Sequence, residues 1–537
     1  MTRARTVASI VMPCRTATRR GGATPPTIPR ANSCSAHNLR SIPRCILRFR
    51  SGQVSKRRVV IVVWDGLRPD LVSSEVTPTL TTLAESGTRV RNSYCVYPSE
   101  TRVNAATLAT GCYPGQHGIV GNKLYVPEVD PHGAVVTGDD ATLTAIAERD
   151  PPLVAVPCLG DYLAEADKSV VVVSSGSPGS SWLSNPRPQD HLYNRALARP
   201  AEAQAAVAQF GAVPPDSLPA TGWLDWQARV CVEHVWPALQ PDVTVCWLTD
   251  PDHTQHRYGL GAPRSLDALR GCDDVLSQLL ASLERLGWRD DTNIIVTSDH
   301  GFTTRQPRHE TDSVQALIAT GLKAAPDSDD LIVSGGAIYL TSEAADRAAG
   351  IVQALQDNPA TGAIVVADDG PAAGCAGTLP LSAAWGGSLH YRRPDIQFSP
   401  VWWDGANEHG VLGYAAGPAG AGHGSTSPRD LQNTLILAGP DVRSRMTSDV
   451  PAGLIDIAPT ALAMLGLPVP AAMDGRALTE VLRPGAAGEQ ATSTPELRPE
   501  TASASASMTA GGSYRQWLRF VHVGETQYFT AAGAERD

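Results

Sequence analysis

Short runs of apolar and β-branched residues recur along the chain, and segments with helical spacing separate them. The runs are too short for helices and apolar on both faces, so they are predicted to be buried strands; they cover residues 59–66, 169–177, 242–250, 293–301 and 433–441. Helices are predicted at 77–87, 104–111 and 265–287, and within 453–468 from about Ile457. This alternation predicts an α/β fold with a mostly parallel central sheet and helices on both faces.

Other parts of the chain follow a different pattern. Residues 303–420 mix short strands with a helix near 342–356 and are predicted to form a smaller α+β insert that caps the core. Residues 485–513 are polar and are predicted to be a linker, followed by a hairpin at 514–537. Residues 1–57 lack apolar periodicity, which predicts a disordered N-terminal extension. The core itself is expected in two parts, 58–302 and 421–484.

Composition narrows the class of protein. Of the 537 residues, 42% are hydrophobic and 18% are charged, which excludes global disorder. No apolar run is long enough for a transmembrane segment. Ten cysteines without a CxxC pair are typical of scattered thiols rather than of a disulfide framework. The N-terminus has no apolar stretch of the kind that a secretory signal needs, so we expect a soluble protein, cytoplasmic, or exported if the true start differs.

The charge is unevenly distributed. The net charge is -10, yet residues 1–58 hold 13 of the 44 Lys and Arg residues and no Asp or Glu. The rest of the chain is therefore strongly acidic, which argues against binding a nucleic acid duplex. An anionic substrate would have to be captured locally, and bound metal ions are the most direct means.

Three carboxylates and three histidines are candidate metal ligands: Asp65, Asp252, His256, Asp299, His300 and His423. Several of them follow predicted strands, and His423 lies in a glycine-rich loop. Each one alone has an ordinary structural explanation, such as a turn or a surface pair. Together they form an oxygen and nitrogen ligand set, which favours Zn²⁺, with Mn²⁺ as the second candidate. Six ligands divide into two sets of three, so two ions are expected.

A candidate nucleophile lies just before a predicted helix. Ser99 and Thr101 both precede the helix, where its dipole and free N–H groups favour an anion. A hydroxyl at this point is also an ordinary N-cap, so the position alone leaves both roles and both residues open.

The motifs resemble those of a known group of enzymes. VVWDG (62–66), YPSETRVN (97–104), TLATGCYPGQHGIVGN (107–122), PDHTQH (251–256), TSDHG (297–301) and GHGS (422–425) occur in the order found in the alkaline phosphatase superfamily. They are most similar to the nucleotide pyrophosphatase/phosphodiesterase branch. The segment 455–478 is also similar to that branch, whereas 303–420 matches poorly.

The resemblance implies roles for individual residues. Thr101 matches the nucleophile, and Asn104 matches an asparagine that contacts a non-bridging phosphate oxygen. One zinc site would comprise Asp252, His256 and His423, and the other Asp65, Thr101, Asp299 and His300. Arg102 stands where relatives often have an apolar residue and could contact a second phosphate or a carboxylate. The implied activity is hydrolysis of phosphodiester or pyrophosphate bonds in small nucleotide-like substrates, through a phospho-threonine intermediate at a site with two Zn²⁺ ions.

Other functions remain open on the sequence. Phosphonoacetate hydrolase or phosphomonoesterase activity would suit the same scaffold. A non-catalytic binding protein and a nucleic-acid-binding protein that uses the basic arm are alternatives of other classes. Cys95 does not open the C/S-x-P-x-R signature that sulfatases need, which excludes formylglycine chemistry. Trp402 and Trp403 could stack on a flat group, although paired tryptophans are more often structural anchors. The sequence does not specify an oligomeric state.

Overall fold

The strand predicted at 59–66 lies at the centre of a nine-stranded sheet, as β1 (Arg58–Trp64). The computed structural model describes residues 56–308, 313–486 and 495–537. The N-terminal extension predicted for residues 1–57 therefore falls almost entirely outside the described residues. None of the described helices combines the length and the apolarity needed to cross a lipid bilayer.

The central sheet is mostly parallel, as predicted. β1 pairs in parallel with β9 and β10, and β6 continues the parallel block between β9 and β7. Antiparallel pairs occur only toward the edges, at β10–β20, β2–β20 and β7–β8, within the described residues. In order, the strands are β21 (Met446–Ser448), β2 (Thr88–Val90), β20 (Leu435–Ala438), β10 (Thr292–Thr297), β1, β9 (Val243–Leu248), β6 (Val170–Ser174), β7 (His191–Asn194) and β8 (Ala198–Arg199).

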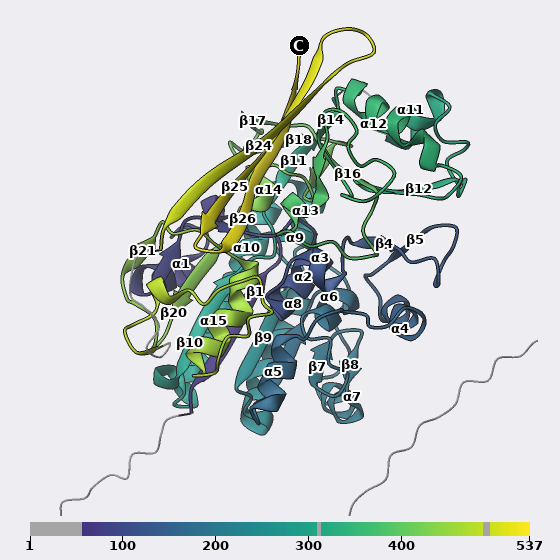
Figure 1. The fold of residues 1–537 in the computed structure, drawn as a ribbon. Helices are drawn as coiled ribbons and strands as arrows, with labels where there is room; N and C mark the ends of the chain where they lie inside the picture. The colour runs from purple at the N-terminus through teal and green to yellow at the C-terminus, as the bar shows by residue number, and fades with distance from the viewer. Residues whose placement is uncertain (1–55, 309–312, 487–494) are drawn as a thin grey trace, which may run out of the picture. The chain divides into compact units, whose positions relative to one another are not determined.

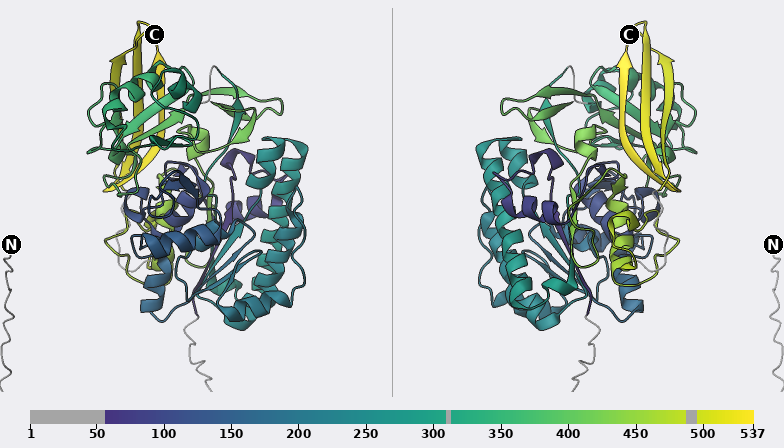
Figure 2. Two further views of the ribbon diagram at one scale, coloured as in Figure 1. Left: turned by 90° about the vertical axis from the view of Figure 1, so that its right-hand side faces the viewer. Right: turned by 90° about the vertical axis from the view of Figure 1, so that its left-hand side faces the viewer.

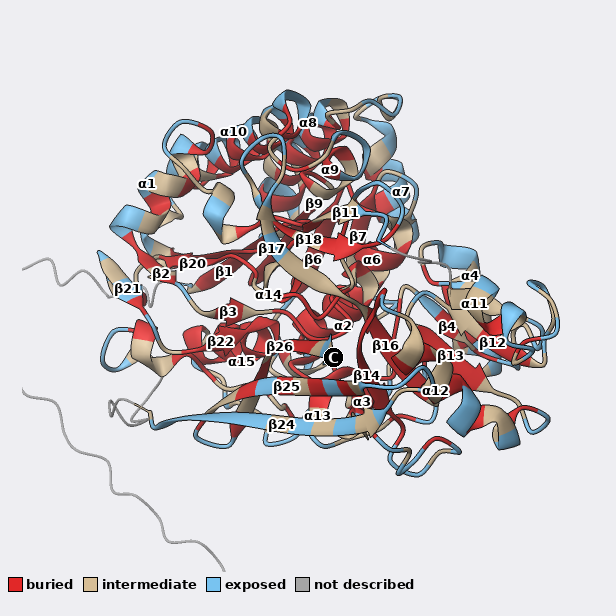
Figure 3. Ribbon diagram, turned by 90° about the horizontal axis from the view of Figure 1, so that it is seen from above, coloured by how far each residue is buried: buried red, intermediate tan, exposed pale blue. Residues whose placement is uncertain are grey.

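Helices cover both faces of this sheet (Figure 2). Val59, Ile61 and Val63 face one core, whereas Val60, Val62 and Trp64 face the other, because successive side chains of a strand alternate. The first core takes side chains from α2 (Thr101–Thr110), α4 (Asp140–Arg149), α5 (Leu159–Glu165), α6 (Pro178–Leu183) and α15 (Ile457–Met464). The second takes them from α1 (Pro78–Ser86), α7 (Ala201–Ala208), α8 (Thr221–Arg229), the π-helix Val230–Leu239 and α10 (Pro263–Arg285). Figure 3 shows the central strands as a buried layer. This arrangement confirms the predicted fold class.

Two small sheets form the insert predicted at 303–420. One has the order β12 (Leu331–Ser334), β13 (Ala337–Leu340), β16 (Ile396–Pro400), β14 (Thr361–Val366), β15 (Leu379–Pro380) and packs with α11 (Ser313–Ala319), α12 (Ala348–Asp357) and α13 (Leu381–Ala384). The other has the order β17 (Trp402–Ala406), β18 (Leu412–Ala416), β11 (Thr303–Gln306), β19 (Gly420–Gly422).

The C-terminal hairpin belongs to a three-stranded sheet (Figure 1). β25 (Ser513–Val523) and β26 (Thr526–Arg536) are the two predicted strands, and β24 (Leu497–Ser507) pairs with β25 along its whole length. The prediction of a linker at 485–513 is therefore wrong for 497–507, because an exposed strand of alternating small residues finds its partner on β25. Gln516 hydrogen-bonds to Ile364 of β14, so this sheet also holds the insert.

The remaining elements are short. α3 (Pro114–His117), α9 (Asp252–Tyr258) and α14 (Pro428–Leu431) connect the larger parts. Two-stranded ladders join β4 (Lys123–Tyr125) to β5 (Ala134–Val136) and β3 (Ser93–Tyr94) to β22 (Ala452–Gly453). Six of the seven described cysteines are buried and all seven are free, as the scattered-thiol interpretation predicts.

Candidate metal centre and nucleophile

The candidate ligands gather at the carboxyl ends of the parallel strands. Asp65 directly follows β1, and Asp299 and His300 follow β10 after one residue. Asp252 opens α9, the helix that comes after β9. Because these strands are parallel neighbours, their ends meet at one edge of the sheet, which is the usual place for a ligand site in such folds.

Two groups of three ligand atoms lie close enough to hold an ion. The first comprises Asp252, His300 and His423, and the second comprises Asp65, Asp299 and His300; within each group the ligand atoms lie within 4.8 Å of one another. His256 lies beside the first group, with its Nε2 3.2 Å from Asp252 Oδ1. The structure thus brings all six candidates together, but His300 contacts both groups, whereas the sequence assigned it to one.

The three histidine rings are held by backbone carbonyls. His256 Nδ1 donates to Ala421 O at 3.0 Å, His300 Nδ1 to Gly301 O at 2.9 Å and His423 Nδ1 to Ser99 O at 2.8 Å. These assignments leave each Nε2 facing the carboxylates. Such fixed orientation of the second ring nitrogen is typical of metal-binding histidines.

Three buried carboxylate oxygens have no hydrogen-bond partner among the described residues: Asp65 Oδ1, Asp252 Oδ1 and Asp299 Oδ2. The other oxygens of two of these groups are engaged, since Trp247 Nε1 donates to Asp65 Oδ2 at 3.1 Å and Gly66 N donates to Asp299 Oδ1 at 3.0 Å. A buried oxygen without a donor is costly unless a cation compensates it. The donor set of this site therefore fits divalent metal ions.

Electrostatics support the same conclusion. Burial and the negative charges of Asp299 and Asp252 raise the pKa of Asp65 well above its usual range. Burial also raises the pKa of Asp299. Burial, together with the neighbouring His300, lowers the pKa of His423 well below its usual range, which keeps this imidazole neutral and able to bind a metal. Cations in the cluster would relieve the repulsion among the carboxylates.

Gly66 permits close packing at the carboxyl ends of the parallel strands. Its φ is +71°, a conformation that side chains disfavour. A Cβ added there would also lie 3.2 Å from Asp252 Cβ and 3.1 Å from the Phe302 ring. The turn after β1 therefore needs glycine for Asp65 to reach the site.

Thr101 is the first residue of α2, and its hydroxyl faces the metal ligands. The N-cap is Glu100, so neither Ser99 nor Thr101 caps the helix. Thr101 Oγ1 lies 3.3 Å from His300 Nε2. Ser99 is instead fully buried, where its Oγ donates to Ser425 O and accepts from Gly424 N. The geometry thus favours Thr101 over Ser99 as the nucleophile.

Asn104 is not placed to contact a substrate, contrary to the expectation from the resemblance. Its side chain is fully buried, its Oδ1 accepts from Val96 N at 2.9 Å, and its Nδ2 donates to Glu100 O at 3.1 Å. Asn104 therefore holds the loop that precedes Thr101. The reason is its position one turn into α2, where the side chain points back along the loop.

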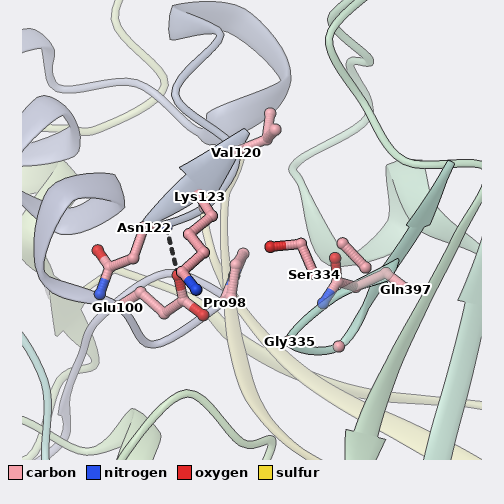
Figure 4. A pocket seen from close by; sticks show the side chains of 11 residues that line it. Pro98, Glu100, Val120, Asn122, Lys123, Ser334, Gly335 and Gln397 are labelled. Carbon is pink, nitrogen blue, oxygen red and sulfur yellow. Dashed lines mark hydrogen bonds between the residues drawn. The ribbon is translucent and has the colours of Figure 1, made fainter. Parts of the chain in front are cut away.

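A different asparagine, Asn122, contacts the backbone next to Thr101. Its Oδ1 accepts from Arg102 N at 3.0 Å, at the start of α2, and its Nδ2 has no partner among the described residues. Its backbone N–H donates to the Glu100 carboxylate (Figure 4). Sequence reasoning missed Asn122, although it ends the quoted motif at 107–122, because only the fold brings it beside Thr101.

The insert lies close to the loop that precedes α2. The turn between β12 and β13, with Ser334 and Gly335, faces Glu100 and Asn122 across a cavity of about 180 Å³ (Figure 4). By contrast, Trp402 and Trp403 are structural anchors, since Trp402 Nε1 donates to Ala532 O and Trp403 stacks on Tyr414. That 303–420 caps the core stays a prediction.

The chain is similar in sequence to known proteins. A family model described as type I phosphodiesterase / nucleotide pyrophosphatase matches residues 59–373. Venom phosphodiesterase 2 of Crotalus adamanteus is 25% identical over 246 residues, which are 45% of this chain and 26% of that protein. The chain thus matches about a quarter of the length of that relative.

Solved structures share the fold. Murine ectonucleotide pyrophosphatase/phosphodiesterase 5, as an inactive threonine-to-alanine variant in complex with AMP, has a TM-score of 0.57 at 17% identity, covering 80% of this chain and 100% of that one. Wild-type alkaline phosphatase PafA has a TM-score of 0.63 at 16% identity, with coverage of 80% and 100%. The fold is therefore that of the alkaline phosphatase superfamily, and the chain belongs to the type I phosphodiesterase / nucleotide pyrophosphatase family.

Proposed function

We propose that this protein hydrolyses phosphodiester or pyrophosphate bonds of small substrates, with Thr101 as the nucleophile. The observation that carries this proposal is the position of the Thr101 hydroxyl, 3.3 Å from His300 Nε2 and beside three buried carboxylates with unpartnered oxygens. The family supports phosphodiester chemistry.

Each group of ligands would hold one divalent ion, and the donor set favours Zn²⁺. His300, which contacts Thr101, would hold one ion with Asp65 and Asp299, and Asp252, His256 and His423 would hold the second. When bound, the two ions would supply a lowered hydroxyl pKa and compensation of negative charge on the phosphoryl group.

The residues of the chain then have separate roles. Thr101 Oγ1 attacks phosphorus in line with the leaving oxygen, so that a phospho-threonine forms and is later hydrolysed by water. The amide of Asn122, at the start of α2, can donate to an equatorial oxygen of the phosphoryl group. Glu100 and Asn104 position the loop, because their hydrogen bonds tie it to Asn122 and to Val96.

A substrate panel tests this function. Metal-loaded protein would be assayed with the p-nitrophenyl ester of thymidine 5′-monophosphate, with p-nitrophenyl phosphate and with phosphonoacetate. We expect the diester to give the highest kcat/KM. A preference for the monoester or for phosphonoacetate would move the protein to one of those activities, and turnover of none, in protein that holds its metals, would favour a binding protein.

A further inference from the structure

A second cavity, of about 180 Å³, has Thr101 in its wall and none of the described residues of the insert. Asp65, Thr101 and Asp252 line it from the metal site. Its other walls include two arginines, Arg102 and Arg195, from separate parts of the fold. Two guanidinium groups in a cavity beside a nucleophile would be unusual if the cavity bound an apolar or neutral group.

Arg102 forms no salt bridge within the described part of the chain, although the negative charges of nearby carboxylates, Glu100 first among them, attract its guanidinium. No carboxylate oxygen among the described residues lies within 4.0 Å of its guanidinium, and its buried Nε has no hydrogen-bond partner there. Its guanidinium lies close to Gly138, where an added Cβ would come within 2.8 Å of Arg102 Nη2. A buried guanidinium N–H without an acceptor is costly, so a ligand that supplies acceptors would be stabilised.

Arg195 reaches the cavity from the turn between β7 and β8. Its Nε donates to Ser175 O at 3.3 Å, and its guanidinium carbon lies 3.8 Å from the centre of the Trp223 ring. Trp223 is itself fixed, because its Nε1 donates to Pro214 O at 2.9 Å. Arg195 forms no salt bridge with a described carboxylate, so its outer nitrogens are held in place and available.

The same contacts argue against a nucleobase in this cavity. The ring of Trp223 is already stacked by Arg195 and by His253, whose ring centre lies 5.4 Å away at 25°. Ser177 and Ser180 add hydroxyls to the wall. A base needs a free aromatic or apolar face, whereas guanidinium and hydroxyl groups suit a carboxylate or a phosphate.

We infer that this cavity binds a second anionic group of the substrate, a carboxylate or a phosphate, carried on the arm that stays on phosphorus. The inference rests on the proposed function and names its substrate class: phosphodiesters with an acidic substituent. The retained arm is favoured because the leaving oxygen departs opposite Thr101, whereas Thr101 and its neighbour Arg102 both line this cavity.

Matched esters test the inference. Four p-nitrophenyl phosphodiesters share one leaving group and differ in the retained arm: ethyl, 2-carboxyethyl, 2-phosphonoethyl and thymidine-5′-yl. We expect one or both acidic arms to exceed the ethyl arm in kcat/KM by roughly 10- to 100-fold, as charge-assisted hydrogen bonds to arginine would give. The better of the two acidic arms identifies the anion as carboxylate or phosphate.

Variants connect this preference to the two arginines. Arg102→Met and Arg195→Met should each bring the ratio of acidic to ethyl kcat/KM close to one. Arg199→Met is the matched control and should keep the ratio, because Arg199 also stacks on a tryptophan, Trp182, outside this cavity. Arg102→Lys keeps a charge and provides the measurement at this position if the methionine variant does not fold.

The possible results separate this inference from the proposed function. Equal kcat/KM values for the ethyl and acidic arms would overturn the anion site. The site would also be overturned if the thymidine ester were cleaved fastest and the arginine variants left its kcat/KM unchanged. Failure to cleave any ester would overturn the function. The anion site would then be tested by calorimetry with 2-carboxyethyl phosphate and ethyl phosphate. Tighter binding of 2-carboxyethyl phosphate that both arginine variants abolish would support the site, and equal binding of the two compounds would contradict it.

Discussion

The imidazole rings of His300 and His423 stack face to face, with their centres 3.6 Å apart and their planes 13° from parallel. Burial and the neighbouring His300 lower the pKa of His423, so the His423 ring is neutral, the form that binds metals. One ring follows β10 and the other follows β19, and their contact joins the two ligand groups.

We expect His423→Ala to lower the metal content from about two ions per chain to about one, because the Asp252 group then loses a ligand. Elemental analysis by mass spectrometry after dialysis measures this. His409→Ala, a histidine outside the ligand groups, should keep both ions. An unchanged content in His423→Ala would remove His423 from the site.

Thr101→Ala should lower kcat by at least about 10³-fold while the metal content stays near that of the wild type, because the nucleophile is lost and the other ligands remain. Thr101→Ser should retain part of the activity. A Thr101→Ala protein with near-normal turnover would require another nucleophile.

Asn122→Ala should mainly lower activity, whereas Asn104→Ala should mainly lower stability. The first removes an amide at the start of α2, so we expect kcat/KM to fall by roughly 10²-fold with a small change in the melting temperature. The second leaves the buried Val96 N–H without its acceptor, so we expect a loss of about 1–3 kcal/mol in unfolding free energy. Equal losses of activity at unchanged stability would contradict this division of roles.

The fold and the ligand set are predictable from the sequence because they depend on local patterns. Apolar runs such as 59–64 alternate with helices, and a parallel sheet brings the residues after its strands to one edge. Asp65 and Asp299 can therefore be placed together from the sequence alone.

The parts that are not predictable depend on contacts between distant segments. The second half of β24 alternates alanine and serine and lacks large apolar residues, and its pairing with β25 makes it a strand. Arg195 lies far from Thr101 in sequence and belongs to none of the quoted motifs. Asn122 ends the motif at 107–122, but only the fold brings it to the start of α2. Asn104 lies near Thr101 in sequence, yet its side chain is turned away from the nucleophile, so closeness in sequence does not imply contact with a substrate.

Trp247→Phe should weaken metal binding without removing a ligand. Trp247 Nε1 donates to Asp65 Oδ2 at 3.1 Å and so orients the carboxylate. Loss of such a supporting bond typically costs about 10- to 100-fold in affinity, and a competition titration with a chelator would measure it. Trp236→Phe, which removes a hydrogen bond to Thr244 instead, is the control and should leave the affinity unchanged. Equal affinities of the wild type and Trp247→Phe would show that this bond does not tune the site.

Asp330 gives the insert a stability that depends on pH. Partial burial raises the pKa of this carboxyl, but hydrogen bonds from Ser328 and Arg347 outweigh it and lower the pKa to about 2. A pKa that is lower in the folded state stabilises the protein above the unfolded pKa of about 4, and this contribution is lost as the pH falls toward 2. We therefore expect Asp330→Asn to reduce the unfolding free energy by about 1 kcal/mol at pH 7, with solvent screening allowed for.

Thermal unfolding of the wild type and Asp330→Asn between pH 7 and pH 3 tests this expectation. The difference in melting temperature should be full and constant above about pH 5 and should shrink below about pH 4, as this carboxyl takes up a proton in the unfolded chain while it is still ionised in the folded protein. Asp327→Asn, an exposed aspartate of the same loop, should match the wild type throughout. A difference in melting temperature that stays constant down to pH 3, or grows there, would mean that Asp330 stabilises the insert through its shape and not through its charge. Arg347 and Lys323 would then not need a carboxylate beside them.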